Sequence, residues 1–210
     1  AGSGLATDGS SFGALSDELA AARDGTVVAP LADLGLIRAS GEDAAPFLHN
    51  LLTNDVQGIS AAGARFAGFC TPKGRLLALF LIWREGDDFL LMLPRDILSP
   101  MLKKLSMYVL RSKVKLSDAT AERALIGFSG SAGALPVPDI DASLPRFGVA
   151  GLTGGQAIRL DGSRWLLAID TGAANAHWQA LTSSAKPVGL AAWQWLEIAA
   201  GQPRVVAATQ

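Results

Sequence analysis

The apolar residues between positions 34 and 116 fall into short runs that predict strands and helices in turn. Residues 34–39 are predicted as a strand, and a helix from about residue 42 to 52 should follow. Acidic residues and Pro46 lie in the predicted first turn, where they suit the positive N-terminal end of a helix. The apolar stripe of this helix comprises Phe47, Leu48, Leu51 and Leu52. Three strands are predicted at 64–71, 75–83 and 88–93, then a helix at 95–109 and a short strand at 113–116. Turn residues separate the three strands, so we expect them to be antiparallel.

A second, similar set of elements follows from about residue 121. Strands are predicted at 124–128, 156–160 and 165–169, and helices at 173–181 and 190–200. Residues 133–155 are rich in Pro and Gly and favour an irregular surface loop. The fold class predicted is therefore α+β, with two related antiparallel-sheet and helix subdomains at 25–118 and 119–205. The pattern leaves open whether these exchange segments, and residues 1–24 are predicted to be a flexible N-terminal arm.

Composition narrows the class of protein. The chain has 210 residues, is 50% hydrophobic, and balances 18 basic against 19 acidic side chains for a net charge of −1, which is typical of a folded protein. We expect no direct nucleic-acid binding from this balance, although a local basic patch can hide in a neutral total. The longest apolar run, residues 76–83, is far shorter than the roughly 20 residues of a membrane-spanning helix, so no membrane association is expected.

The side chains that commonly carry catalysis or metals are few. Cys70 is the single cysteine, which fits a reducing cytoplasm, and its place on a predicted strand favours a buried, inert thiol. His49 and His177 are far apart and are interpreted as ordinary helix residues, so no metal site is expected. Asp139 and Asp141 are interpreted as a solvated loop. No self-contained catalytic constellation emerges, and catalytic residues are predicted to be absent.

Two of the five tryptophans, Trp193 and Trp195, lie close together on the last predicted helix. Two positions along a helix are about 200° apart, so the two indoles cannot share a face. One should pack in the core while the other faces a cavity or solvent, where an indole can stack on a flat heterocycle. The alternative, two structural tryptophans, stays open.

Four segments of the chain, taken together, carry a family resemblance. They are residues 41–56, 70–75 (Cys-Thr-Pro-Lys-Gly-Arg), 108–114 (Tyr-Val-Leu-Arg-Ser-Lys-Val) and 193–203. In this order and spacing, which cover about residues 31–205, they resemble the YgfZ family, which is related to the glycine-cleavage T protein and other folate-binding proteins.

The resemblance implies a tetrahydrofolate-binding accessory protein for iron-sulfur cluster assembly or repair and for cluster-dependent tRNA modification. The cofactor would be tetrahydrofolate or a folate derivative, and the partners would be iron-sulfur proteins or tRNA-modifying enzymes. Trp193 occupies the family's folate-site tryptophan position in the W-x-x-L-x-I-x-A-G-x-P segment. Leu34 stands where the family has a second folate tryptophan, and it offers apolar contact without a π face.

The alternative implied by the wider superfamily is a folate-dependent aminomethyltransferase or demethylase. Those enzymes carry an acidic pair after a Gly-Gly turn, whereas residues 75–79 here contain no carboxylate. A carboxylate is needed there for acid-base or electrostatic help. The superfamily glutamate before the last Ala-Gly is replaced by Ala199, and Glu197 is two positions away. A non-enzymatic role is therefore favoured, and a scaffold that has lost its ligand is a third reading.

The resemblance also implies that the chain is truncated. The family's Lys-Gly-Cys-Tyr-x-Gly-Gln-Glu stretch and its C-terminal β-barrel normally follow the last helix by a few dozen residues. Here the sequence ends at Ala208-Thr209-Gln210, before that stretch. We therefore expect the T-protein type of fold without its barrel.

Overall fold

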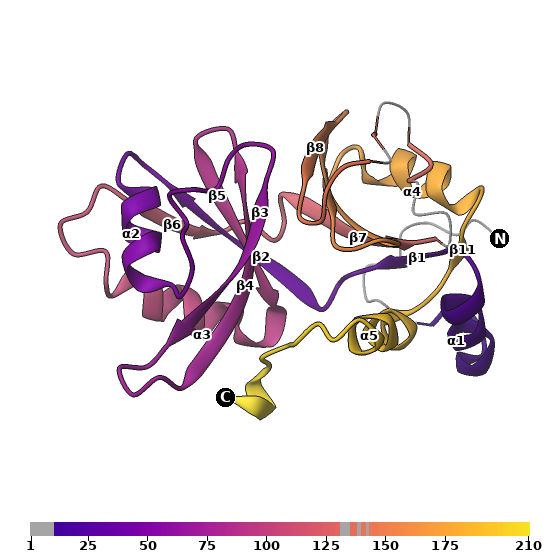
Figure 1. Cartoon of the computed structure of the whole chain (residues 1–210), viewed down its shortest axis with the longest axis horizontal. Coiled ribbons are helices and arrows are strands. Elements are labelled where there is room, and N and C mark those ends of the chain that lie inside the picture. The colour runs from indigo at the N-terminus through magenta and orange to yellow at the C-terminus, as the bar shows by residue number, and fades with distance from the viewer. Residues whose placement is uncertain (1–10, 131–134, 138–139, 142) are drawn as a thin grey trace. The chain divides into compact units, whose positions relative to one another are not determined.

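The computed structural model describes residues 11–130, 135–137, 140–141 and 143–210 (Figure 1). These residues divide into two compact units, each built from two stretches of the chain. Unit 1 combines the stretch up to Asp33 with Ala121–Gln202, and unit 2 combines Leu34–Thr120 with Pro203–Gln210. The chain therefore crosses between the units after Asp33, after Thr120 and after Gln202.

Unit 2 holds a five-stranded antiparallel sheet in the order β3-β4-β5-β2-β6. The strands are β2 (Leu34–Ser40), β3 (Ala64–Cys70), β4 (Leu76–Glu85), β5 (Asp88–Pro94) and β6 (Lys115–Asp118), and the helices are α2 (Ala44–Leu51) and α3 (Arg95–Ser106). A 3₁₀ turn, η1 (Ala207–Thr209), lies in the last stretch. The turn between β3 and β4 uses Gly74 at φ +81°, a conformation that glycine adopts without strain.

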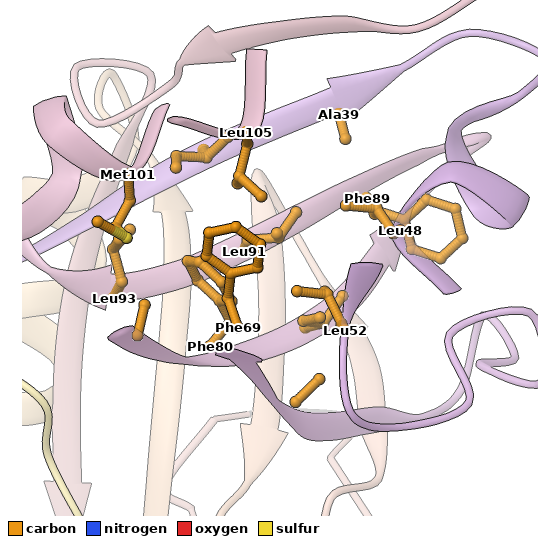
Figure 2. Close-up of a cluster of buried hydrophobic side chains, with 14 of the residues drawn as sticks. Ala39, Leu48, Leu52, Phe69, Phe80, Phe89, Leu91, Leu93, Met101 and Leu105 are labelled. Atoms are coloured by element: carbon orange, nitrogen blue, oxygen red, sulfur yellow. The ribbon is translucent and has the colours of Figure 1, made fainter. Parts of the chain in front are cut away.

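The core of unit 2 lies between its sheet and both helices (Figure 2). Alternate residues on β4 and β5, such as Phe80 and Leu91, point to this face, as the period of two in a strand requires. Leu48 from α2 and Met101 and Leu105 from α3 complete the same cluster. The helical spacing of the apolar residues in α2 and α3 thus places both helices on one face of the sheet.

Unit 1 holds a six-stranded sheet in the order β11-β1-β7-β10-β9-β8. The strands are β1 (Val27–Pro30), β7 (Arg123–Ser129), β8 (Val149–Leu152), β9 (Gly155–Arg159), β10 (Arg164–Asp170) and β11 (Lys186–Pro187), and the helices are α1 (Leu15–Asp24), α4 (Ala174–Thr182) and α5 (Leu190–Ala199). All pairings are antiparallel except that of β1 with β11.

The two faces of this sheet carry different helices, as Figure 1 shows with α4 and α5 on opposite sides of β7. Trp178 of α4 joins a buried cluster with Phe128 of β7 and Trp165 of β10. The neighbouring residue Gly127 points the other way and faces Trp193 of α5. Both sheets are open, and the residues that the structure describes form no closed barrel. The α+β class predicted from the sequence is confirmed.

Several local predictions differ from the structure. Residues 15–24 were expected in a flexible arm, but they form α1, because this helix packs against α5 and buries Glu18 and Ala22. Strands β1, β8 and β11 were not predicted, and β8 lies in the stretch expected to be an irregular loop. Residues 27–33 lie in unit 1, whereas the sequence placed them in the first subdomain. The remainder of the expected arm, residues 1–10, lies outside the described residues.

Over those same described ranges, no helix is long and apolar enough to cross a membrane.

Candidate functional site

Helix α5 carries the strongest candidate chemistry, and its two tryptophans lie on different faces. The side chain of Trp193 is completely buried, whereas Trp195 is 36% exposed. The prediction that one indole packs in the core while the other is accessible is therefore confirmed. Gln194, between them, donates from Nε2 to Oδ2 of Asp33 at 3.1 Å, which ties the helix to the segment between β1 and the end of the first stretch of unit 1.

The indole of Trp193 is fixed on two sides. Its Nε1 donates to Oε1 of Glu197, one turn later on the helix, at 3.2 Å, and Glu197 is itself only 4% exposed. Its benzo ring covers Gly127 of β7, where an added Cβ would lie 2.6–2.7 Å from three ring atoms. Such distances are shorter than any real contact, so the sheet accepts this indole because residue 127 has no side chain. Trp193 is therefore a rigid part of the unit 1 core.

Leu34, the second residue that the resemblance placed at the folate site, opens β2 of unit 2. It is 5% exposed and pairs with Pro94 of β5. Trp193 and Leu34 thus belong to different units, and neither side chain is open to solvent. The assignment of folate to these two residues stays a prediction.

A buried carboxylate, which the sequence did not point out, holds the start of α5. Glu18 of α1 is 1% exposed; its Oε2 accepts the Gly189 N–H at 2.9 Å, and its Oε1 accepts from the Ser11 hydroxyl and the Gly13 N–H. Burial raises the pKa of Glu18, but the hydrogen bonds, that from Gly189 first, outweigh it and leave the pKa below its ordinary value. Gly189 lies 171 positions away in sequence, so no local pattern could have revealed this contact.

The outward face of α5 is apolar. Its exposed residues include Trp195 and Ile198, with Ala191 and Ala199 beside them, and both polar residues of the helix, Gln194 and Glu197, are instead engaged in hydrogen bonds. Helix faces that meet solvent are normally polar. Trp195 is consequently the accessible indole of α5, whereas Trp193, to which the resemblance assigns the folate site, is buried.

The other candidate residues stay apart. His49 of α2 lies with Nδ1 3.2 Å from Oδ1 of Asp55, and His177 of α4 lies with Nε2 2.8 Å from the Thr153 carbonyl. Cys70, expected to be buried, is only partly buried; it is the last residue of β3, where the register with β4 shifts. Across the described part of the chain, no three His, Cys, Asp or Glu side chains gather as a metal site would require.

The loop acids and the turn after β3 can also be placed. Asp141 is exposed and accepts the Ser143 N–H at 2.7 Å, whereas Asp139 lies outside the described residues. The segment after Lys73-Gly74 enters β4 with Arg75 and Leu76 exposed, and it carries no carboxylate.

Comparison with known proteins gives matches over most of the chain. The tRNA-modifying protein YgfZ of Vibrio vulnificus strain YJ016 is 26% identical over 183 residues, which cover 87% of this chain and 55% of that protein. The tRNA-modifying protein YgfZ of Escherichia coli O127:H6 is 27% identical over 193 residues, which cover 90% of this chain and 59% of that protein. The chain is similar to YgfZ proteins. The resemblance to YgfZ inferred from the four sequence segments is thus confirmed, while no protein-family model matches.

The matched region is only part of the YgfZ proteins, and solved structures share its fold. The chain spans about half the length of the curated YgfZ relatives it matches. The glycine cleavage aminomethyltransferase T of Bartonella henselae superposes with a TM-score of 0.78 at 19% identity over 92% of this chain and 60% of that one. The heterotetrameric sarcosine oxidase of Corynebacterium sp. U-96 gives 0.53 at 17% identity, over 75% of this chain and 84% of that one. At these identities the likeness shows the T-protein fold alone.

Proposed function

We propose that the chain is a YgfZ-type, tetrahydrofolate-binding accessory protein that serves iron-sulfur cluster assembly or repair and cluster-dependent tRNA modification. The observation that supports this most is the 26% identity over 87% of the chain to a protein named tRNA-modifying protein YgfZ. The T-protein fold, at a TM-score of 0.78, supports the folate part of the proposal by analogy only. Its partners would be iron-sulfur proteins or tRNA-modifying enzymes.

The folate site is proposed on α5, with Trp193 as its inner wall. Trp193 is held by Glu197 and by the Gly127 backbone, so its indole has one orientation. A preorganised aromatic wall lowers the entropy lost when a flat heterocycle binds. Because Trp193 has no exposed surface, a pterin reaches its ring only after the covering side chains move, whereas Trp195 is open from the start.

A non-enzymatic role is proposed because the carboxylates that aminomethyl transfer needs have no counterpart here. Residues 75–79 hold none, and Ala199 replaces the superfamily glutamate. Glu197 does not compensate, since it is buried and accepts the Trp193 Nε1–H. General acid-base catalysis requires a group within hydrogen-bond reach of the reacting proton. The alternative, a folate-dependent aminomethyltransferase or demethylase, would have to obtain that group elsewhere.

The folate proposal is tested by titrating the chain with tetrahydrofolate while following tryptophan fluorescence, using Trp193→Phe and Trp195→Phe as a matched pair. We expect quenching in the unsubstituted chain, and an affinity at least about tenfold weaker in Trp193→Phe than in Trp195→Phe. Circular dichroism verifies that both variants fold. Equal affinities in the two variants would reject Trp193 as the wall, and the absence of any binding would reject the folate proposal.

The enzymatic alternative is tested on the same sample. Tetrahydrofolate-dependent release of ammonia or formaldehyde from aminomethyl or N-methyl donors should stay at the level of the buffer. Turnover above that level, lost on heating the protein, would establish the alternative instead.

The iron-sulfur part is tested in bacteria that lack their own YgfZ protein. Expression of this chain should restore the tRNA nucleosides whose synthesis depends on iron-sulfur enzymes, measured by mass spectrometry of hydrolysed tRNA. Restoration by the unsubstituted chain and by Trp195→Phe, but not by Trp193→Phe, would link the role to the proposed folate site.

A further inference from the structure

The neutral total charge of the chain conceals one strongly basic stretch. Between Asp96 and Asp118 the sequence carries no acidic residue, yet it carries Lys103, Lys104, Arg111, Lys113 and Lys115. The whole chain has 18 basic and 19 acidic residues, so this concentration of one sign is a local feature. A stretch of this kind attracts polyanions even when the protein as a whole is neutral.

The fold gathers these cations at one end of unit 2. Helix α3 ends at Ser106 and packs against β6, which begins at Lys115, so the loop between them turns the chain back on itself. Figure 1 shows this loop at the left of the view, beyond α3 and β6. Lys103 and Arg111 are exposed and make no ion pair or hydrogen bond with any residue that the structure describes. Lys113 instead pairs with Glu42.

The same loop exposes apolar side chains. Met107 is 61% exposed, Tyr108 45% and Leu110 88%. The Tyr108 ring meets the buried Phe69 ring edge to face, with centroids 6.0 Å apart, so Tyr108 is held at one side and open at the other. An aromatic ring fixed in this way and set among cations is the arrangement on which nucleic-acid bases stack.

Leu110 also has a strained backbone. Its φ is +43°, which L-residues with a Cβ rarely adopt, and burial does not compensate for it, because the side chain is the most exposed large apolar one described. Hydrogen bonds on the C-terminal side hold the loop: Ser112 N–H donates to the Val109 carbonyl at 2.8 Å, and Lys113 N–H to Oδ2 of Asp43 at 2.8 Å. Strain maintained by the surrounding structure is characteristic of functional sites.

A groove of about 410 Å³ lies beside Tyr108, along α2. Phe47 and Leu51 supply apolar lining, and Asn50 and Ser112 supply side chains that can donate and accept hydrogen bonds. Its one carboxylate, Asp43, already accepts the Lys113 N–H. The groove is thus able to take an unstacked base next to the ring of Tyr108.

We infer that this basic-aromatic patch, defined as Lys103, Lys104, Met107, Tyr108, Leu110 and Arg111, binds single-stranded RNA. The cations would contact phosphates, and a base would stack on Tyr108 with its edge in the groove. We favour RNA over a membrane surface because Tyr108 is held against Phe69 beside a groove whose lining includes hydrogen-bonding side chains, which an unstacked base can use and a lipid tail cannot. The inference revises the expectation, drawn from net charge, of no direct nucleic-acid contact. It uses no residue of the proposed folate site, so either can fail without the other.

The test uses the full 210-residue chain and a fluorescein-labelled, unstructured RNA of about 12 nucleotides, followed by fluorescence anisotropy across a salt series. Lys103→Ala/Arg111→Ala should weaken binding about tenfold. It should also reduce the slope of the logarithm of the binding constant against the logarithm of the salt concentration by about 1.4, since each phosphate contact on a single strand contributes about 0.7. Tyr108→Leu, which keeps an apolar contact with Phe69, should weaken binding about tenfold, and Tyr108→Phe should bind like the unsubstituted chain.

The matched control is Lys73→Ala/Arg95→Ala, which removes two exposed cations of unit 2 outside the patch. Equal weakening in this control, or no binding of the RNA by the unsubstituted chain, would overturn the inference. Vesicles of phosphatidylserine and phosphatidylcholine form the second arm. If the unsubstituted chain binds the vesicles but not the RNA, and if Met107→Ser/Leu110→Ser abolishes vesicle binding, the patch is a membrane contact and the inference is wrong.

Discussion

The two units bury different kinds of side chain. Across the described residues, the buried polar or charged residues are Glu18, Ser129, Arg164 and Glu197, and all four lie in unit 1. The core of unit 2, shown in Figure 2, is assembled from apolar residues. The sheet of unit 1 therefore packs against a core that includes buried polar groups, whereas the sheet of unit 2 packs against an apolar core.

The difference shows what each kind of core can specify. Apolar burial stabilises in proportion to area but has no direction, so it tolerates small shifts of a helix. In unit 1, Arg164 donates from Nε to Asp161 at 2.7 Å and from Nη2 to Gln202 at 3.2 Å. The Glu18 carboxylate accepts the N–H of Gly189, which directly precedes α5. Buried polar groups are costly unless paired, so the hydrogen bond from Gly189 to the buried Glu18 carboxylate fixes the start of α5 against α1. Helix α5, on which the folate site is proposed, thus lies in the unit whose core contains buried hydrogen bonds.

The largest effect is expected from the apolar core of unit 2. Phe80→Ala removes a fully buried ring and should lower the free energy of unfolding by about 3–5 kcal/mol. Urea denaturation measures the loss, which should be the same at pH 7 and pH 4, because no titratable group belongs to this cluster. Hydrogen exchange should rise in β3–β5 before β7–β10. A loss that depends strongly on pH would contradict the distinction between the units.

Glu18→Gln tests the directional core of unit 1. Loss of a charged acceptor for several N–H and O–H donors should cost about 2 kcal/mol at pH 7. Because the pKa of Glu18 in the fold lies below its ordinary value of 4.5, the carboxylate stabilises the fold above that pH, and the contribution is lost as pH falls through the folded-state pKa. The variant should therefore lose less stability on acidification than the unsubstituted chain. Glu42→Gln, on the surface of unit 2, is the control and should change neither quantity by more than about 0.5 kcal/mol.

Gly127→Ala probes the contact that positions Trp193. The added methyl group would overlap the indole, and we expect a loss of about 2 kcal/mol by urea denaturation. In a double-mutant cycle, Trp193→Phe should recover part of this loss, since the smaller ring leaves room. Gly151→Ala, in β8 of the same sheet, has no heavy atom within 4 Å of the new methyl group and should stay within about 0.5 kcal/mol of the unsubstituted chain. Additive losses in the cycle would show that the two residues do not press on each other.

The smallest effect is expected at the strained loop of unit 2. Asn adopts positive φ more readily than Leu, so Leu110→Asn should stabilise the chain by about 0.5 kcal/mol in thermal or urea unfolding. Met107, nearby and exposed, has φ −66°, so Met107→Asn should give no gain. Destabilisation by Leu110→Asn would mean that the Leu side chain is needed by the fold itself.

The sequence predicted those parts of the fold that depend on neighbouring residues. In unit 2, the apolar runs and the turns at Gly74 and Gly86 determine the hairpins, and both glycines have positive φ as turns require. Strand β1 was missed because its pairing is distant: Val27 lies opposite Ser129 on one side and Lys186 on the other. A strand of only four residues is too short for its periodicity to reveal such partners.

The candidate site was predictable in part for the same reason. The spacing of Trp193 and Trp195 on one helix determines that their indoles diverge, and the structure agrees. Which of the two is buried depends on Gly127, 66 positions earlier, and on Glu197 being turned inward. Such tertiary contacts are invisible to a helical pattern. The basic stretch after α3 was present in the sequence, but a whole-chain charge average concealed it.

The order in which the chain visits the two units bears on its synthesis. A ribosome would release the complete sheet of unit 2, all of it within Leu34–Thr120, before unit 1 has more than α1 and its first strand. Strand β1 lies inside the unit 1 sheet, between β11 and β7, so it must wait unpaired until residues 123–129 emerge and is flanked on both sides only after Lys186. During that interval an apolar segment is open to chaperones and to other nascent chains. The interleaving of the units thus leaves β1 unpaired while the whole sheet of unit 2 is made, although β1 precedes that sheet in the chain.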